Sequence, residues 1–180
     1  TAELSEAVTC TVSDGNDINI TQAGVYVLQG SAKNVTVFVE AGDEDKVQLV
    51  LDGLSVTNDD FPVIYVKNAD KVFVTTTEGS ENSLSVTGSF VADGSTNTDA
   101  VIFSRDDLVF NGLGSLSISS TDNGISGKDD VKLTGGRRTH TPHQPQGRRH
   151  APRRRPHRQR AVPRHRGQRL HRRLRRDRHR

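Results

Sequence analysis

A short motif that occurs twice in the second half of the sequence constrains the fold more than any other feature. Ser104–Leu108 (SRDDL) returns 23 residues later as Gly127–Val131 (GKDDV), so a cation, two aspartates and an aliphatic residue recur. A second short apolar run and a glycine follow each copy. Repeats with periods of about 20 to 50 residues indicate solenoids, in which each unit stacks on the next to complete a core that it cannot bury alone.

Short alternating segments, separated by turn residues, fill one period of this repeat. They are Leu116–Ile118, Gly124–Ser126 and Val131–Leu133, in which apolar residues alternate with small or polar ones. Three such strands per coil fit a parallel β-helix better than a hairpin, which needs two longer strands and a tight turn. We therefore predict an all-β fold, a right-handed parallel β-helix (solenoid) of about four coils. Its ladders should link the segments that begin at Val47, Val72, Leu108 and Val131.

The pattern of short strands extends toward the N-terminus. β-branched segments bounded by turn residues precede the repeat, at 25–28, 35–39, 47–51, 54–56, 63–66, 72–74, 84–86, 101–103 and 108–110. Residues 1–22 are polar with weak alternation, and we expect a lead-in strand or N-terminal cap there. Residues 23–136 then form the predicted β-helix, in which residues 88–98 are a polar surface loop.

The composition changes abruptly at Gly136. Up to this residue the chain has 21 Asp and Glu against seven Lys and Arg, whereas residues 137–180 have 18 Arg, one Asp and no Lys. The formal net charge of +3 therefore describes neither part. We expect residues 137–180 to be a disordered Arg/His/Pro-rich tail, because its like charges repel and its few apolar residues cannot form a core.

Two origins are considered for this tail. A frameshift is favoured, because codons for Gly, Ala, Asp and Thr in a GC-rich gene become codons for Arg, Pro, His and Gln when they are read out of frame. The β-helix would then be truncated at its C-terminal end. The alternative is a genuine basic arm, which would bind nucleic acid or another polyanion nonspecifically by neutralising its charges.

Several separated motifs resemble one bacterial family. They are 41–53 (AGDEDKVQLVLDG), 64–72 (IYVKNADKV), 78–84 (EGSENSL) and the two Asp-Asp repeats. Residues 23–136 resemble the secreted carbohydrate-binding domain-containing proteins, parallel β-helices related in architecture to pectate lyases. The resemblance implies a calcium-containing, non-catalytic β-helix that binds acidic plant cell-wall polysaccharide (polygalacturonate or pectin) or cellulose. It also implies a protein that is secreted or attached to the bacterial cell surface, and we expect a monomer.

The repeated aspartates are the candidate metal ligands. Equivalent positions in adjacent coils of a β-helix lie about 4.8 Å apart. Asp106 should therefore lie over Asp129, and Asp107 over Asp130. Stacked carboxylates repel each other, and Ca²⁺, a hard cation that takes oxygen ligands, would offset the repulsion.

Three further residues just ahead of the adjoining strands complete the candidate calcium site: Asp99, Asp122 and Asn123. The alternative is that the aspartates lie at solvated turns, where they bond their own backbone and pair with Arg105 and Lys128. The residue types alone favour this alternative, and the family resemblance favours calcium.

Four cations are the candidate carbohydrate-binding residues: Lys67, Lys71, Arg105 and Lys128. They can pair with the carboxylates of a uronic-acid polymer, and the guanidinium of Arg matches a carboxylate in a bidentate manner. The alternative is ordinary surface charge. Sugar sites also use aromatic rings, and the chain has only two Tyr and six Phe, which weakens the case for a deep neutral-sugar cleft.

A calcium-dependent polysaccharide lyase is the alternative enzymatic function. Such an enzyme abstracts a proton beside a uronate carboxylate and needs a Lys or Arg base. Arg105 and Lys128 are conceivable bases, but both recur with the repeat, which favours a structural role. The part before Gly136 has no His, and its single cysteine, Cys10, has no partner. We therefore predict no catalytic residues, and no apolar run is long enough to span a membrane.

Overall fold

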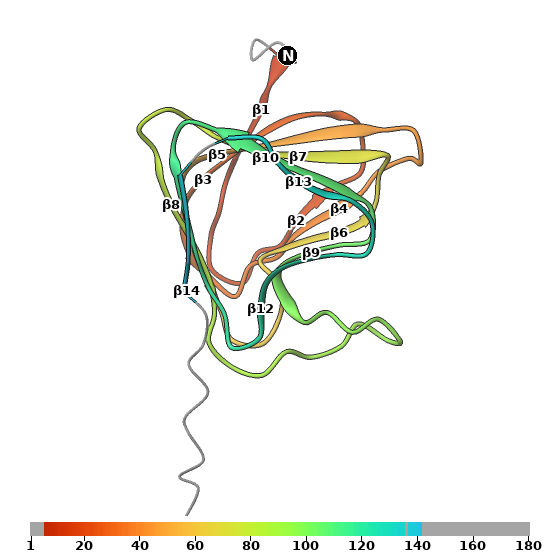
Figure 1. Cartoon of the computed structure of the whole chain (residues 1–180), viewed down its shortest axis with the longest axis vertical. Coiled ribbons are helices and arrows are strands. Elements are labelled where there is room, and N and C mark those ends of the chain that lie inside the picture. The colour runs from red at the N-terminus through yellow and green to blue at the C-terminus, as the bar shows by residue number, and fades with distance from the viewer. Residues whose placement is uncertain (1–5, 136, 142–180) are drawn as a thin grey trace, which may run out of the picture. The chain divides into compact units, whose positions relative to one another are not determined.

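In the computed structural model, residues 6–135 and 137–141 are described, and their regular elements are β-strands that wind through three faces (Figure 1). The first face holds β1 (Val8–Thr11), the first half of β3 (Gly24–Lys33), the first half of β5 (Lys46–Asn58), β7 (Lys71–Thr76), β10 (Asp107–Gly112) and β13 (Val131–Leu133). The second face holds the second halves of β3 and β5, β8 (Glu81–Val86), β11 (Ser115–Ser119) and β14 (Arg137–Thr141). The third face holds β2 (Ile18–Ile20), β4 (Val37–Glu40), β6 (Ile64–Asn68), β9 (Ala100–Ser104) and β12 (Asn123–Gly127).

Strand pairing within each face is parallel, as the repeat predicts. On the first face Val47 pairs with Val72, Val72 with Leu108, and Leu108 with Val131. These are the four segment starts that the sequence pattern aligned. The all-β parallel solenoid is thus confirmed for the described residues, and the right-handed sense of the coil stays a prediction.

The ladders extend beyond both ends of the expected β-helix. β1 pairs with β3 and β2 pairs with β4, so coiling begins within residues 1–22. The first face therefore has strands from six successive turns of the chain, and the expected number of about four coils was too low. β1 is largely exposed, which explains its weak apolar alternation. At the other end the backbone of β14 pairs with β11, past Gly136.

Most of the tail, residues 142–180, lies outside the described residues, as do the side chains of residues 137–141. The predictions of disorder and of a frameshift therefore stay predictions. Within the described residues no helix is long and apolar enough to cross a membrane.

One apolar core runs through the centre of the coils. Inward-facing side chains from all three faces fill it, for example Leu49, Leu84 and Ile64, none of which has exposed surface. Turn residues satisfy the backbone between the coils. The buried side chain of Asn58 is one of them, because it accepts from Val35 N–H at 2.9 Å and donates to the Val35 carbonyl at 2.9 Å.

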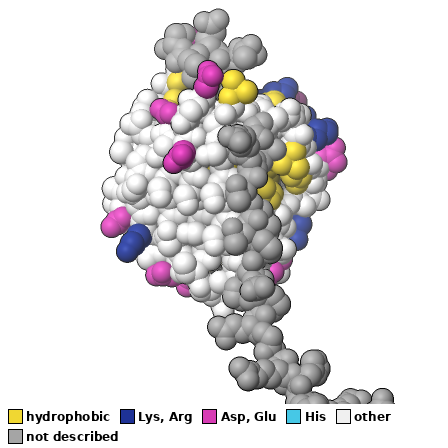
Figure 2. Space-filling model, turned by 60° about the vertical axis from the view of Figure 1, so that its left-hand side comes forward, with side chains coloured by type: hydrophobic (Ala, Val, Ile, Leu, Met, Phe, Trp, Pro, Cys, Tyr) yellow, Lys and Arg dark blue, Asp and Glu magenta, His cyan; other side chains and the backbone are white. Residues whose placement is uncertain are grey.

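The outer side of the second face is formed by small hydroxyl side chains in register. Ser31, Ser55, Ser83 and Ser117 form one column across four strands. A space-filling view shows a surface of mainly backbone and uncharged side chains, with few Asp, Glu, Lys or Arg (Figure 2). This face offers hydroxyl groups and little charge.

Gly112 at the end of β10 is required by close packing as well as by its backbone angle. Its φ is 108°, and a Cβ there would collide with the backbone of Thr76 in the preceding coil. Gly53 has a φ of 73° but open space around it. We expect Gly112→Ala to lower the free energy of unfolding by about 1–3 kcal/mol more than Gly53→Ala, because only Gly112→Ala adds overpacking to strain. Chemical denaturation measures both, and equal losses would contradict the close packing.

The chain between β8 and β9 forms the expected surface loop. Residues 87–99 contain no strand, only an isolated bridge between Asp93 and Thr96. Val91 N–H donates to the Asp60 carbonyl at 2.8 Å, which ties the loop to the turn before β6. Asp93 reaches Lys67 of β6, so the loop lies over the third face.

Candidate functional site

Three aromatic side chains form a column on the outer side of the third face. Phe38 of β4 pairs in register with Tyr65 of β6, which pairs with Phe103 of β9. They point outward because their strand neighbours, such as Val37 and Val39, point into the core. The ring centroids are 5.9 Å apart for Phe38 and Tyr65 and 5.5 Å apart for Tyr65 and Phe103. Phe61, from the turn before β6, lies 6.0 Å from Tyr65 and extends the cluster.

A column of cations lies beside the aromatic column. The column consists of Lys67, Arg105 and Lys128, which follow the outward-facing residues of β6, β9 and β12 by two positions. The backbone N–H groups of Arg105 and Lys128 still donate to the preceding strand, so the three cations lie at neighbouring places in adjacent coils. The Lys67 ammonium lies 4.9 Å from the ring centre of Phe38, and that of Lys128 lies 5.4 Å from the ring centre of Phe103. Cation–π attraction of this kind holds the ammonium groups over the aromatic rings.

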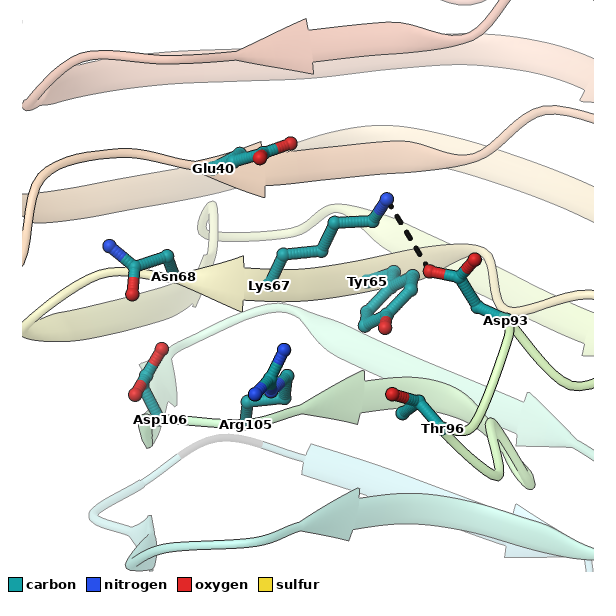
Figure 3. Close-up of a pocket in the computed structure, with 8 residues that line it drawn as sticks. All are labelled: Glu40, Tyr65, Lys67, Asn68, Asp93, Thr96, Arg105 and Asp106. Carbon is teal, nitrogen blue, oxygen red and sulfur yellow. Dashed lines mark ion pairs between the residues drawn. The ribbon is translucent and has the colours of Figure 1, made fainter.

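A polar cavity of about 450 Å³ opens between these columns and the loop 87–99 (Figure 3). Its lining residues are Glu40, Tyr65, Lys67, Asn68, Asp93, Thr96, Arg105 and Asp106. They come from β4, β6, the end of β9 and the loop, so three coils and an insertion build one cavity, which we call the groove.

Some charged side chains of the groove already have partners within the protein, and Arg105 has no ion-pair partner among the described residues. Lys67 Nζ lies 3.4 Å from Asp93 Oδ2, as Figure 3 shows by the dashed line. No carboxylate of the described residues forms an ion pair with Arg105, which is exposed. Asp106 Oδ2 accepts a hydrogen bond from Ala69 N–H at 3.0 Å. Arg105 is therefore the cation of the groove that is available to an anionic ligand.

Tyr65 is a buried hydrogen-bonding group rather than a base. Its side chain is 1% exposed, and burial, followed by the charge of Asp93, raises the pKa of its phenol above the usual value. The phenol is therefore protonated at neutral pH.

A second hollow, of about 410 Å³, lies on the other side of Phe38. Its lining residues are Asp17, Asn34, Thr36, Phe38, Asn58, Asp59, Asp60 and Phe61. Phe38 and Phe61 are half-buried, so their rings border both solvent and the aromatic cluster. An extended ligand on the third face would thus meet a groove with charges of both signs, half-buried aromatic rings and an acidic hollow.

The structure brings together three of the four predicted carbohydrate-binding residues, Lys67, Arg105 and Lys128. Lys71 lies apart from them, because the chain turns a corner after Asn68 and Lys71 begins β7 on the first face. There Lys71 Nζ pairs with Asp107 Oδ2 at 3.1 Å, and the hydrogen bond to Asp107 raises the pKa of Lys71. Lys71 thus stays charged and neutralises one of the repeated aspartates.

The repeated aspartates stack as expected, but their carboxylates have partners in the protein. The pairing of Leu108 with Val131 puts the two Asp-Asp motifs at equivalent places in adjacent coils. Asp129 Oδ1 accepts from the N–H of Asp130 at 3.0 Å, and Asp130 Oδ2 lies 3.3 Å from Lys132 Nζ. This matches the alternative of turn aspartates that bond their own backbone, although the paired cations are Lys71 and Lys132 instead of Arg105 and Lys128.

The remaining predicted calcium ligands do not join them. Asp99 Oδ2 accepts from Asn97 Nδ2 at 3.1 Å, while its Oδ1 is buried without a hydrogen-bond partner. Asp122 and Asn123 lie on the adjacent coil, where Asn123 pairs in register with Ala100. Across the described part of the chain, no group of three or more His, Cys, Asp or Glu side chains is placed to hold a metal ion. The seven predicted ligands therefore do not form one site.

The aromatic column is the part of the site that sequence reasoning missed. Phe38, Tyr65 and Phe103 each lie in a segment that was recognised as a strand, but they were not aligned with one another. The signal was available for two of them, because Tyr65 and Phe103 each precede a cation by two residues.

The half-buried rings of Phe38 and Phe61 offer apolar surface, and the adjacent cations offer partners for carboxylates, the combination that a sugar acid presents. The fold and this surface thus define a class, the carbohydrate-binding β-solenoids. The chain belongs to the family of carbohydrate-binding domain-containing proteins, whose model matches residues 14–144. The resemblance found in the sequence is confirmed.

Two similar proteins were found. A carbohydrate-binding domain-containing protein of Acetivibrio thermocellus is 34% identical over 123 residues, which are 67% of this chain and 43% of that protein. The solved polysaccharide lyase-like protein from C. thermocellum, a gadolinium derivative, superimposes with a TM-score of 0.69 at 30% identity. The superposition covers 73% of this chain and 60% of that chain. The chain thus spans less than two thirds of the length of either relative.

Proposed function

We propose that the third face binds acidic plant cell-wall polysaccharide, such as polygalacturonate, without cleaving it, at the surface of a bacterium. The observation that carries the proposal is Arg105, an exposed guanidinium beside the aromatic column that forms no ion pair with the described residues. A guanidinium binds a carboxylate through two parallel hydrogen bonds, and the half-buried Phe38 is the ring of the column with surface left for a sugar. The family supports a carbohydrate partner, and the choice of an acidic polymer rests on Arg105.

The direct experiment is retention of the full chain on immobilised polygalacturonate compared with cellulose. Polyglutamate is added in excess, because the 18 Arg of residues 137–180 would otherwise bind any polyanion. We expect retention on polygalacturonate that weakens with salt, since the ion pairs with Arg105 are solvent-exposed. Equal retention on cellulose would contradict the acidic specificity. Complete loss of retention with polyglutamate would assign the binding to the basic tail.

A lyase is the second candidate, and the name of the solved relative, polysaccharide lyase-like, favours it. Arg105 is the candidate base, because it is the exposed cation of the groove that has no ion-pair partner among the described residues. Lyase action on polygalacturonate leaves an unsaturated product that absorbs in the ultraviolet. We expect no such absorbance, and its appearance with wild type but not with Arg105→Ala would establish the lyase instead.

Calcium assistance stays a prediction, since the described aspartates do not gather into one ligand set. Backbone carbonyls could complete the coordination of two stacked aspartates. If they do, Ca²⁺ should raise the melting temperature of the wild type by mass action, and Asp106→Asn with Asp129→Asn should reduce that rise. A flat calcium titration of the wild type would remove calcium from the account.

A further inference from the structure

The loop 87–99 places a carboxylate of the protein where a ligand carboxylate would lie. Asp93 Oδ2 is 3.4 Å from Lys67 Nζ, and the same ammonium lies 4.9 Å from the ring centre of Phe38. Figure 3 shows Lys67 reaching across the groove toward Asp93, above the ring of Tyr65. The cation nearest the middle of the aromatic column is therefore already neutralised.

The position of Asp93 is fixed by backbone contacts. Asp93 N–H donates to the Thr96 carbonyl at 3.0 Å, and Thr96 N–H donates to the Asp93 carbonyl at 2.9 Å. Thr98 Oγ1 donates to the Val91 carbonyl at 2.7 Å, and Val91 N–H donates to the Asp60 carbonyl. The Asp93 carboxylate thus lies at the groove as part of a hydrogen-bonded turn.

The groove consequently has one available cation and several carboxylates. Arg105 follows Lys67 along the column, and their backbones lie on neighbouring strands about 4.8 Å apart. Glu40, Asp93 and Asp106 also line the cavity. A glycan with consecutive ionised uronates would place one carboxylate on Arg105 and bring the next toward Asp93. The second placement is repulsive, because two carboxylates that approach each other repel even when solvent screens them.

We propose that Asp93 is a specificity-determining residue that makes the groove select isolated carboxylates over consecutive ones. The ligand class is then a glycan in which an ionised uronate, held by Arg105, is flanked by uncharged residues, as in methyl-esterified polygalacturonate. Selectivity of this kind comes from a built-in repulsion against the competing ligand. The inference rests on the proposed binding of acidic polysaccharide at the third face.

The test compares Asp93→Asn with wild type on two probes, fully de-esterified polygalacturonate and highly methyl-esterified pectin, with excess polyglutamate present. We expect Asp93→Asn to increase the affinity for the de-esterified polymer about three- to tenfold, because it removes one repulsive charge and leaves the Lys67 ammonium free to pair with the second carboxylate. The affinity for the esterified polymer should change less than about twofold. The ratio of the two affinities is therefore the readout.

Asp70→Asn is the matched control. It removes the carboxylate of the Lys46–Asp70 ion pair, in which the two charged atoms are also 3.4 Å apart. The side chain of Asp70 is 42% exposed, and that of Asp93 is 44% exposed. We expect this variant to leave the ratio unchanged. An unchanged ratio in Asp93→Asn, or an equal loss of affinity for both polymers, would overturn the role of Asp93. Failure of the wild type to bind either polymer would overturn the proposed function itself.

Discussion

Arg105→Ala is expected to weaken binding of the full chain to polygalacturonate by about 10- to 150-fold. Hydrogen bonds to a charged partner contribute roughly 1.5–3 kcal/mol, and truncation of Arg105 removes both arms of a bidentate pair. Stability should change little, because Arg105 is exposed and makes no ion pair with the described residues. Isothermal titration with polyglutamate present measures the affinity, and a melting curve checks the fold.

Two further variants sharpen this test. Arg105→Lys keeps the charge but loses the fork geometry, so it should recover only part of the affinity. Lys33→Ala removes an exposed cation from the second face, away from the groove, and should bind as the wild type does. Equal losses in Arg105→Ala and Lys33→Ala would show that only net charge matters and would contradict a specific site.

Asn58→Ala should lower the free energy of unfolding by about 3–5 kcal/mol, because the side chain of this last residue of β5 holds the backbone of the following turn and of the preceding coil. Asn58 is 2% exposed, accepts from Val35 N–H, and donates toward the carbonyls of Val35, Phe61 and Pro62. Alanine would leave these buried groups without partners, and each unsatisfied group costs about 1–3 kcal/mol. Urea unfolding measures the loss.

Asn19→Ala is the control for this effect, because Asn19 is exposed on the outer side of β2. It should change the free energy of unfolding by less than about 0.5 kcal/mol. The Asn58→Ala variant should also bind acidic glycan less well, since Asn58 holds the turn that carries Phe61 to the aromatic column. A small loss for Asn58→Ala, similar to that for Asn19→Ala, would mean that water or a repacked turn replaces its hydrogen bonds.

The fold was predictable because the repeat fixes the register of its strands. The two Asp-Asp motifs align Leu108 with Val131, and the apolar segments that begin at Val47 and Val72 continue the same ladder. The first coil was not recognised. β1 covers only one edge of the core, so it has little apolar alternation for a sequence pattern to detect.

The candidate site was only partly predictable, because strand positions alone do not say which face a residue joins. Lys67 and Lys71 are close in sequence, yet the corner between β6 and β7 puts them on different faces. The reach of Asp93 to Lys67 depends on the path of the loop 87–99, for which the sequence has no periodic signal. The ion-pair partners of the repeated aspartates could not be predicted either. Asp107 pairs with Lys71 of the preceding coil, and Asp130 pairs with Lys132, two residues further along the chain.

The central claim, that the third face binds the glycan, can be tested by hydrogen–deuterium exchange of the full chain with and without oligogalacturonate. We expect slower exchange in residues 61–68 and 88–106, which carry Phe61, Tyr65 and Phe103, the loop with Asp93, and Arg105. Exchange in β8 and β11 of the second face should stay unchanged, because that face lies outside the groove. Protection confined to residues 137–180 would contradict the claim and assign binding to the basic tail.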